Sequence, residues 1–156
     1  MKRIDSASFD LASAILTQAN EMTLATVRAD GSPHATTVSF ASDGLTLYAA
    51  IALDSHKAHD IRHDARVSLT VNAPFRSWSE IQGVSIDGIA SFVDQPALQA
   101  RVSELILRKL PAYASIISDA EALPWPGMLF IQIDASAMTL LDYTRRFGYS
   151  EQFDLR

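Results

Sequence analysis

The residues with the most evident chemistry lie in one stretch, Ser55–Leu69, which reads SHKAHDIRHDARVSL. It holds three of the chain's four histidines, one lysine and two arginines, although the whole chain has a net charge of −5. Imidazole and cationic groups gathered in this way serve a metal ion, an anion such as a phosphate group, or the solvation of an exposed helix face. The spacing of the residues distinguishes these three interpretations.

The metal interpretation rests on His59–His63, HDIRH, in which two imidazoles stand four residues apart on one face of a helix. The pattern resembles the H-E-x-x-H motif of zinc proteases, with aspartate in the place of the general base. Asp60 has a shorter side chain than glutamate, and no third ligand follows nearby in the sequence. We therefore expect no metal site, and we expect His59, Arg62 and His63 to keep an exposed helix face solvated.

Ser55, His56 and Lys57 differ because they stand where a strand is expected to end and a helix to begin. The first backbone N–H groups of a helix have no partner within the helix, and the helix dipole is positive at that end. A hydroxyl, an imidazole and an ammonium group at such a point form a compact anion site, and a phosphate group is its natural ligand. Helix capping alone accounts for Ser55, but not for the pair that follows it.

The composition limits the classes of protein to which the chain can belong. Its 156 residues, 48% of them apolar, suffice for one domain with its own core over residues 1–156. No apolar run approaches the ~18 residues of a membrane span, and the start MKRIDSASFDL lacks the apolar block of a signal peptide. The basic residues form no long run, which disfavours nucleic-acid binding. The absence of cysteine excludes disulfides and thiolate chemistry, and it suits the cytoplasm, where we expect the protein to act.

The hydrophobic periodicity predicts the elements that position these residues. An amphipathic helix is expected over Ser6–Asn20, capped by Asp5 or Ser6, and a three-strand antiparallel meander follows it. Gly83 and Gly88 mark bulges or close approaches within a later strand. Strands are expected at residues 23–29, 34–41, 45–51, 67–71, 81–93, 128–133 and 138–143, and further helices at 55–64, 94–110 and 113–122. No strand–helix–strand unit repeats, so the expected fold is mainly β, an antiparallel barrel with flanking helices.

Two stretches of the sequence resemble a known family. TLATVRADGSPHATTVSFASDGLTLYAA, followed by SHKAHDIRHDARVSLTV, is similar to the N-terminal half of the pyridoxamine 5′-phosphate oxidase-like, FMN-binding split barrels. GVSIDGIASFV resembles the next long strand of that family, and LLDYTRRFGYSEQF is similar to the tails of its bacterial members. The resemblance implies a six-stranded antiparallel split β-barrel that binds FMN between the two subunits of a homodimer. It further implies an FMN-dependent oxidoreductase or flavin reductase that takes a small-molecule substrate or electron donor.

The resemblance also implies the residues that bind the cofactor. Lys57 would contact the FMN phosphate beside Ser55, and His56 stands where the family usually has arginine. The second strand would line the flavin, Gln82 would reach the flavin of the partner subunit, and the tail would close the site. The implied cofactor residues are Thr36, Thr37, Val38, Ser39, Ser55, His56, Lys57, Gln82, Arg145 and Arg146.

The chain departs from the authentic oxidases at the positions that hold their substrate. Thr36 and Ala41 stand where those enzymes carry arginine and lysine, and the C-terminal motif with tryptophan and Arg-x-His is absent. Oxidation of pyridoxamine phosphate is therefore not expected. His56 in place of arginine also removes a permanent bidentate charge.

Two other interpretations of the chain stay open at the level of sequence. Proteins of haem utilisation share the fold and have a similar short-helix region, and an imidazole would then bind the iron. The candidates for that imidazole are His34, His56, His59 and His63. A flavin-binding dimer that has lost catalysis is the second possibility, and the missing substrate residues favour it. The sequence identifies no catalytic acid or base.

Overall fold

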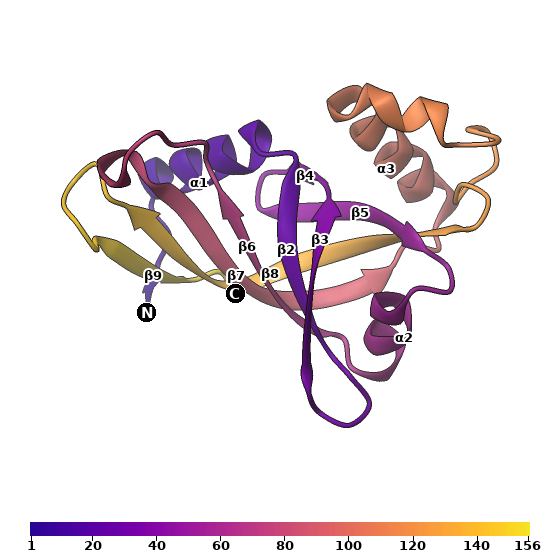
Figure 1. Ribbon diagram of the computed structural model, residues 1–156, viewed down its shortest axis with the longest axis horizontal. Coiled ribbons are helices and arrows are strands. Elements are labelled where there is room, and N and C mark those ends of the chain that lie inside the picture. The colour runs from indigo at the N-terminus through magenta and orange to yellow at the C-terminus, as the bar shows by residue number, and fades with distance from the viewer.

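A computed structural model describes all 156 residues, and one sheet runs through it (Figure 1). The strand order is β1-β9-β8-β7-β6-β2-β3, with β5 paired to β8 and β4 paired to β5. The strands are β1 (Lys2–Arg3), β2 (Glu21–Val27), β3 (Pro33–Ser39), β4 (Ala41–Asp43), β5 (Thr46–Ala52), β6 (Arg66–Asn72), β7 (Gln82–Phe92), β8 (Met128–Asp142) and β9 (Ser150–Asp154).

Three α-helices pack beside this sheet, namely α1 (Ser6–Gln18), α2 (His56–His63) and α3 (Pro96–Lys109). Two short 3₁₀ turns, η1 (Trp78–Glu80) and η2 (Pro111–Ser115), lie in the connections. Of the two expected caps, Asp5 begins α1, because its Oδ1 accepts a hydrogen bond of 2.8 Å from the backbone N–H of Ser8. None of the helices combines the length and the apolar character needed to cross a bilayer.

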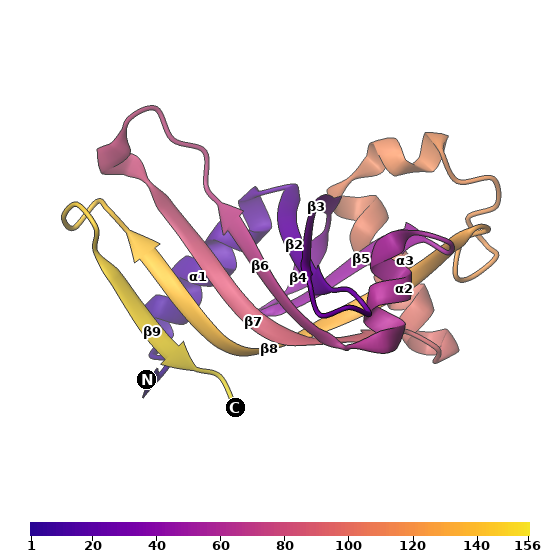
Figure 2. The same cartoon turned by 60° about the horizontal axis from the view of Figure 1, so that its bottom comes forward.

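β8 joins the two halves of the sheet. It pairs with β7 over most of its length, with β5 along its first half and with β9 along its second half. No pairing joins β3 to β5, so the curved sheet remains open between these two strands (Figure 2). The six long strands are antiparallel to one another wherever they pair. The expected mainly β split barrel with flanking helices is therefore confirmed, with β1, β4 and β9 as short additions.

Two hydrophobic clusters hold the elements together. In the larger cluster, Ile15 and Leu16 of α1 pack against the inward side chains of the barrel strands. In the smaller one, Trp125 contacts Phe130 edge to face, at 4.9 Å between ring centroids, and lies against Val102 of α3. The indole Nε1–H of Trp125 donates to Ser103 Oγ at 3.2 Å, which satisfies the one polar atom of this buried side chain.

Three predictions from periodicity are wrong. The strands expected at 128–133 and 138–143 form a single strand, because Asp134, Ala135 and Ala137 between them also pair with β7, on either side of a bulge. The expected meander does not form, since β5 pairs with β4 and β8 instead of β3. The helix expected at 113–122 is reduced to η2 and turns, and Tyr113 and Ile117 pack against the smaller cluster. The polar tail, for which no element was expected, forms β9.

Candidate functional site

The start of α2 has the structure that the sequence predicted. Ser55 is the N-cap, and its Oγ accepts from the backbone N–H of Ala58 at 3.2 Å and donates to the carbonyl of Ala52 at 2.8 Å. The side chain of His56 is exposed and that of Lys57 is half-buried. Neither forms a hydrogen bond or an ion pair within the chain, so both have donors free to meet an anion.

β3 is an edge strand at the open side of the barrel. It pairs with β2 alone, from Pro33 to Ser39. At alternate residues, the backbone N–H and C=O groups therefore point away from β2 and have no partner in the sheet. Along it, Val38 is buried, Thr36 and Ser39 are half-buried and Thr37 is exposed. The strand therefore offers a ligand both backbone groups and small polar side chains.

A buried polar network connects β2, β3 and α2. Asp60, only 3% exposed, accepts at one carboxylate oxygen from Thr26 Oγ1 at 2.7 Å, and Nδ1 of His34 lies 3.1 Å from the same atom. Burial works to raise the pKa of Asp60, but the hydrogen bonds from Thr26 and His34 outweigh it and hold the pKa below its usual value. The His34 ring stands edge to face with that of His56, at 6.2 Å between centroids.

A second network surrounds Asp142 at the opposite end of the barrel. Gln82 Nε2 donates to Asp142 Oδ1 at 3.0 Å, and Arg145 Nε lies 3.3 Å from Oδ2. Burial again works to raise the pKa of Asp142, but hydrogen bonds from Thr144 and Gln82, with the charge of Arg145, hold it below its usual value. Arg146 forms no ion pair, and its guanidinium lies over the ring of Tyr149, 5.3 Å from the centroid.

The predicted cofactor residues thus form two groups that lie far apart in one chain. Ala52, just before α2, pairs with the first residue of β8, and Gln82 pairs with the last. At about 3.3 Å per residue, the fifteen-residue strand has a contour length of roughly 45 Å. Figure 1 accordingly shows α2 and the loop that follows β8 at opposite ends of the molecule.

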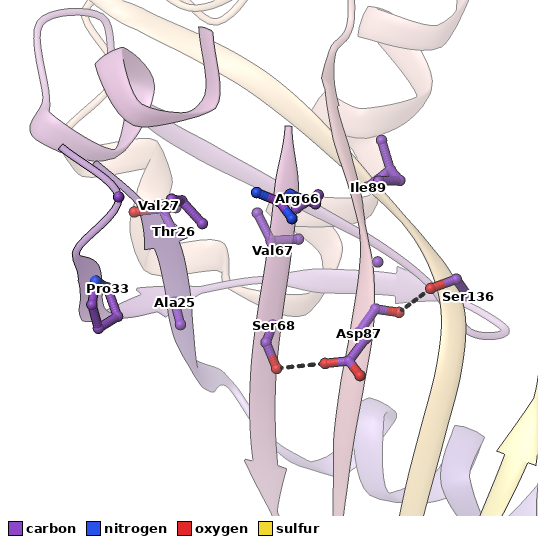
Figure 3. A pocket seen from close by; sticks show the side chains of 12 residues that line it. Ala25, Thr26, Val27, Pro33, Arg66, Val67, Ser68, Asp87, Ile89 and Ser136 are labelled. Atoms are coloured by element: carbon purple, nitrogen blue, oxygen red, sulfur yellow. Dashed lines mark hydrogen bonds between the residues drawn. The ribbon is translucent and has the colours of Figure 1, made fainter. Parts of the chain in front are cut away.

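The largest cavity lies elsewhere, on the outer face of the sheet. It has a volume of about 580 Å³, and none of the predicted cofactor residues lines it. Figure 3 shows it between β2, β6 and β7, with Ser68 Oγ donating to Asp87 Oδ1 at 2.8 Å on its floor. Within one chain, therefore, no enclosed pocket corresponds to the predicted flavin site.

The histidine pair that resembles a zinc motif and the aspartate between them face different sides of α2. His59 and His63 are exposed on α2, while Asp60 between them is turned inward onto Thr26 and His34. No group of three or more histidine or acidic side chains converges as metal ligands would. The solvated helix face expected for His59, Arg62 and His63 is confirmed, since all three are exposed.

Comparison with known proteins decides the family. A sequence profile of the family described as pyridoxamine 5′-phosphate oxidase matches residues 10–141. The chain belongs to this family. A search of curated proteins finds no match. A structure from Listeria innocua, provisionally named as a pyridoxamine 5′-phosphate oxidase, is 25% identical with a TM-score of 0.68, over 86% of this chain and 98% of that one.

Other solved structures share the fold of this chain. The haem binding protein from Mycobacterium smegmatis has a TM-score of 0.80 at 17% identity, over 97% of this chain. The chain spans 59% of the length of that protein. HutZ, the haem storage protein from Vibrio cholerae, has a TM-score of 0.64 at 14% identity, over 78% of this chain and 85% of that one. At these identities the likeness extends to the fold alone.

Sequence reasoning missed the Thr26–Asp60–His34 network. Its members are 34 and 26 residues apart along the chain, and no local pattern predicts that they meet. One signal was present, since Asp60 stands four residues after His56 and so lies on the same face of α2. The partner of that aspartate, however, depends on how α2 packs against β2 and β3.

Proposed function

We propose that the protein is a homodimeric FMN-binding flavoprotein, with two symmetric cofactor sites between its subunits, and that it is an FMN-dependent oxidoreductase or flavin reductase. The observation that carries this proposal is the separation of the predicted cofactor residues into two groups at opposite ends of β8. A two-fold axis brings the Gln82 end of one subunit to the α2 end of its partner, which unites the two groups twice. Membership of the family supports the same arrangement.

The residues of the first group fit a phosphate ester and a flat polar ring. Lys57 and His56 have unpaired donors beside the start of α2, where the positive end of the helix dipole adds to their charge. The unpaired backbone groups of β3, with Thr36 and Ser39, suit the hydrogen-bonding edge of an isoalloxazine ring. When bound, FMN supplies the transfer of hydride or single electrons. The chain would hold its phosphate, orient its ring and exclude water from it.

Replacement of Lys57 by alanine tests the phosphate assignment. A charge-assisted contact contributes roughly 1.5–3 kcal/mol, so Lys57→Ala should weaken FMN binding about ten- to a hundredfold. Riboflavin lacks the phosphate and should bind the wild type and the variant equally. Fluorescence titration measures both ligands, and His59→Ala, on the exposed face of the same helix, is the matched control. Equal losses of affinity for FMN and riboflavin would contradict the assignment.

We also propose that pyridoxamine phosphate is not a substrate. Thr36 and Ala41 replace the two basic residues of the authentic oxidases, and Ala41 is 2% exposed, with no charge to offer. FMN-reconstituted protein should therefore produce no pyridoxal phosphate or peroxide from it. A coupled peroxide assay measures this, and rapid turnover would show that other residues hold the substrate.

Haem binding is a second candidate, and one observation favours it. The carboxylate of Asp60 lies against Nδ1 of His34, which is the support typical of a metal-bound imidazole. Two proteins that share the fold are named for haem binding and haem storage. The absorption spectrum of protein incubated with each cofactor separates the candidates. Flavin bands that persist through gel filtration support FMN, whereas a Soret band that His34→Ala abolishes supports haem.

A further inference from the structure

Another cavity lies apart from the predicted cofactor residues, where α1 and α3 both pack on β4 (Figure 1). It has a volume of about 230 Å³. Two of its lining side chains carry hydroxyls and two carry cationic groups, but none carries a carboxylate. The lining residues are Thr17, Ala41, Ser42, Leu105, Arg108 and Lys109. Lys109 is therefore a half-buried amine beside a cavity that offers it no acidic partner.

The surroundings of the Lys109 amine suit an N–H donor but not an anion. Its Nζ donates to the carbonyl of Leu16 at 2.8 Å and lies 3.9 Å from the centroid of the Phe40 ring. Leu16 lies in the last turn of α1, and Lys109 is the last residue of α3, so the negative ends of two helix dipoles lie close by. An anionic ligand is therefore disfavoured here, whereas a neutral group that keeps one N–H can still donate to Leu16.

We propose that Lys109 is a site of acylation by a small acyl phosphate, and that the cavity beside it holds the acyl group. This modification goes beyond the proposed function and does not depend on the cofactor. The neutral amine attacks the acyl carbon, a C–N bond forms, and the C–O bond to the phosphate breaks as the phosphate leaves with the electron pair. One proton of the amine passes through water to the phosphate. The resulting amide keeps an N–H for the carbonyl of Leu16 and no longer carries a charge.

The other two lysines of the chain are less suited to this reaction. Burial lowers the pKa of Lys109 to about 8, so a large fraction of its amine is neutral and nucleophilic near neutral pH. The Nζ of Lys2 lies 3.0 Å from Glu151, and the hydrogen bond to that carboxylate raises the pKa of Lys2. Lys57 lines none of the cavities. Lys109 alone therefore combines a reactive amine with space for the product.

Incubation of the full chain with acetyl phosphate at about pH 7.5 tests the proposal. Mass spectrometry of proteolytic fragments should show Lys109 acetylated roughly tenfold faster than Lys2, because far more of its amine is neutral at that pH. Ser42→Leu narrows the cavity and should slow the reaction of Lys109 several-fold without affecting Lys2. Ser79→Leu, at an exposed position in η1, is the matched control. Equal rates at Lys109 and Lys2 in the wild type would overturn the proposal, and so would a Ser42 variant that reacts as fast as the wild type.

The stability of the acetylated protein tests whether the cavity accepts the acyl group. Lys2→Arg combined with Lys57→Arg leaves Lys109 as the only lysine, which confines the modification of lysine to this position. The acetylated form of this variant should unfold at pH 7 at a urea concentration at least as high as the unmodified form, because the buried charge is gone and the N–H donor remains. A lower unfolding midpoint would show that the acyl group does not fit, and the proposal would be wrong. If Ser42→Leu does not fold, this measurement and the wild-type rates decide the question.

Discussion

At the scale of single residues, Lys109 shows how burial and charge oppose each other in this fold. Its Nζ donates to the carbonyl of Leu16 at 2.8 Å, near the end of α1, and lies 3.9 Å from the centroid of the Phe40 ring. Both contacts favour a cation, since the last carbonyls of a helix and the face of an aromatic ring are negative. No carboxylate pairs with it, however, and burial lowers the pKa of Lys109 to about 8.

This shift makes the stability of the protein depend on pH in the alkaline range. Between pH about 8 and the ordinary lysine pKa of 10.5, the unfolded chain binds more protons than the folded one. The free energy of unfolding should therefore increase as pH rises through that window, and the cost of the buried charge is fully present below it. Lys109→Met retains the length of the side chain without its titration. Urea unfolding between pH 7 and 10 should show wild type gaining stability relative to this variant, and parallel curves would refute the shifted pKa.

At the scale of elements, the long pair β7–β8 depends on one bulge. The register shifts between Asp87 and Gly88, and Ser136 Oγ donates to the carbonyl of Asp87 at 3.0 Å. A Cβ on Gly88 would lie 2.5 Å from the backbone oxygen of Asp134, a distance that real Cβ contacts do not reach. The glycine therefore permits the close approach that lets both strands continue past the bulge.

Gly88→Ala should destabilise the protein by about 1–3 kcal/mol, because the backbone of β8 must move to accept the methyl group. Chemical unfolding followed by circular dichroism measures the loss. Ser91→Ala, an exposed position on the same strand, should change stability by less than about 0.5 kcal/mol. A Gly88 variant as stable as the wild type would mean that the strands do not approach as closely as described.

At the scale of the whole molecule, the outer face of the sheet is suited to contact with a second copy. The exposed residues there include small side chains such as Ala35, Thr37 and Ser91. Ile89 is 48% exposed beside the cavity of about 580 Å³ (Figure 3). We therefore propose this face, with Ile89 beside the cavity, as the surface that meets a second copy.

We expect the wild type to sediment as a dimer and Ile89→Glu to shift it toward monomer, because a carboxylate in an apolar interface loses its hydration. FMN bound only by the dimer should oppose this shift, with a stabilisation of about 2.7 kcal/mol at a hundredfold excess over its dissociation constant. Ile116→Glu, at a 62% exposed position outside the sheet, is the matched control. A monomeric wild type that binds FMN stoichiometrically would contradict the interface site.

The sequence alone determined the features that depend on neighbouring residues. Asp5 and Ser55 cap their helices because each side chain reaches a backbone N–H three residues away. Gly83 and Gly88 mark close approaches because only glycine lacks the Cβ that would collide there. The order of motifs also indicated the family that the profile match shows.

Tertiary structure alone decided the features that depend on distant partners. The strand of residues 128–142 is continuous because β7 pairs with it on both sides of the bulge, and the bulge shifts the buried positions from 131 and 133 to 138 and 140. Asp60 became a buried anchor for His34 because α2 packs against two strands that precede it by about thirty residues. Gln82 and Lys57 lie at opposite ends of the molecule because their segments pair with opposite ends of β8. Hydrogen bonds between strands that are remote in the sequence leave no trace in the local sequence pattern.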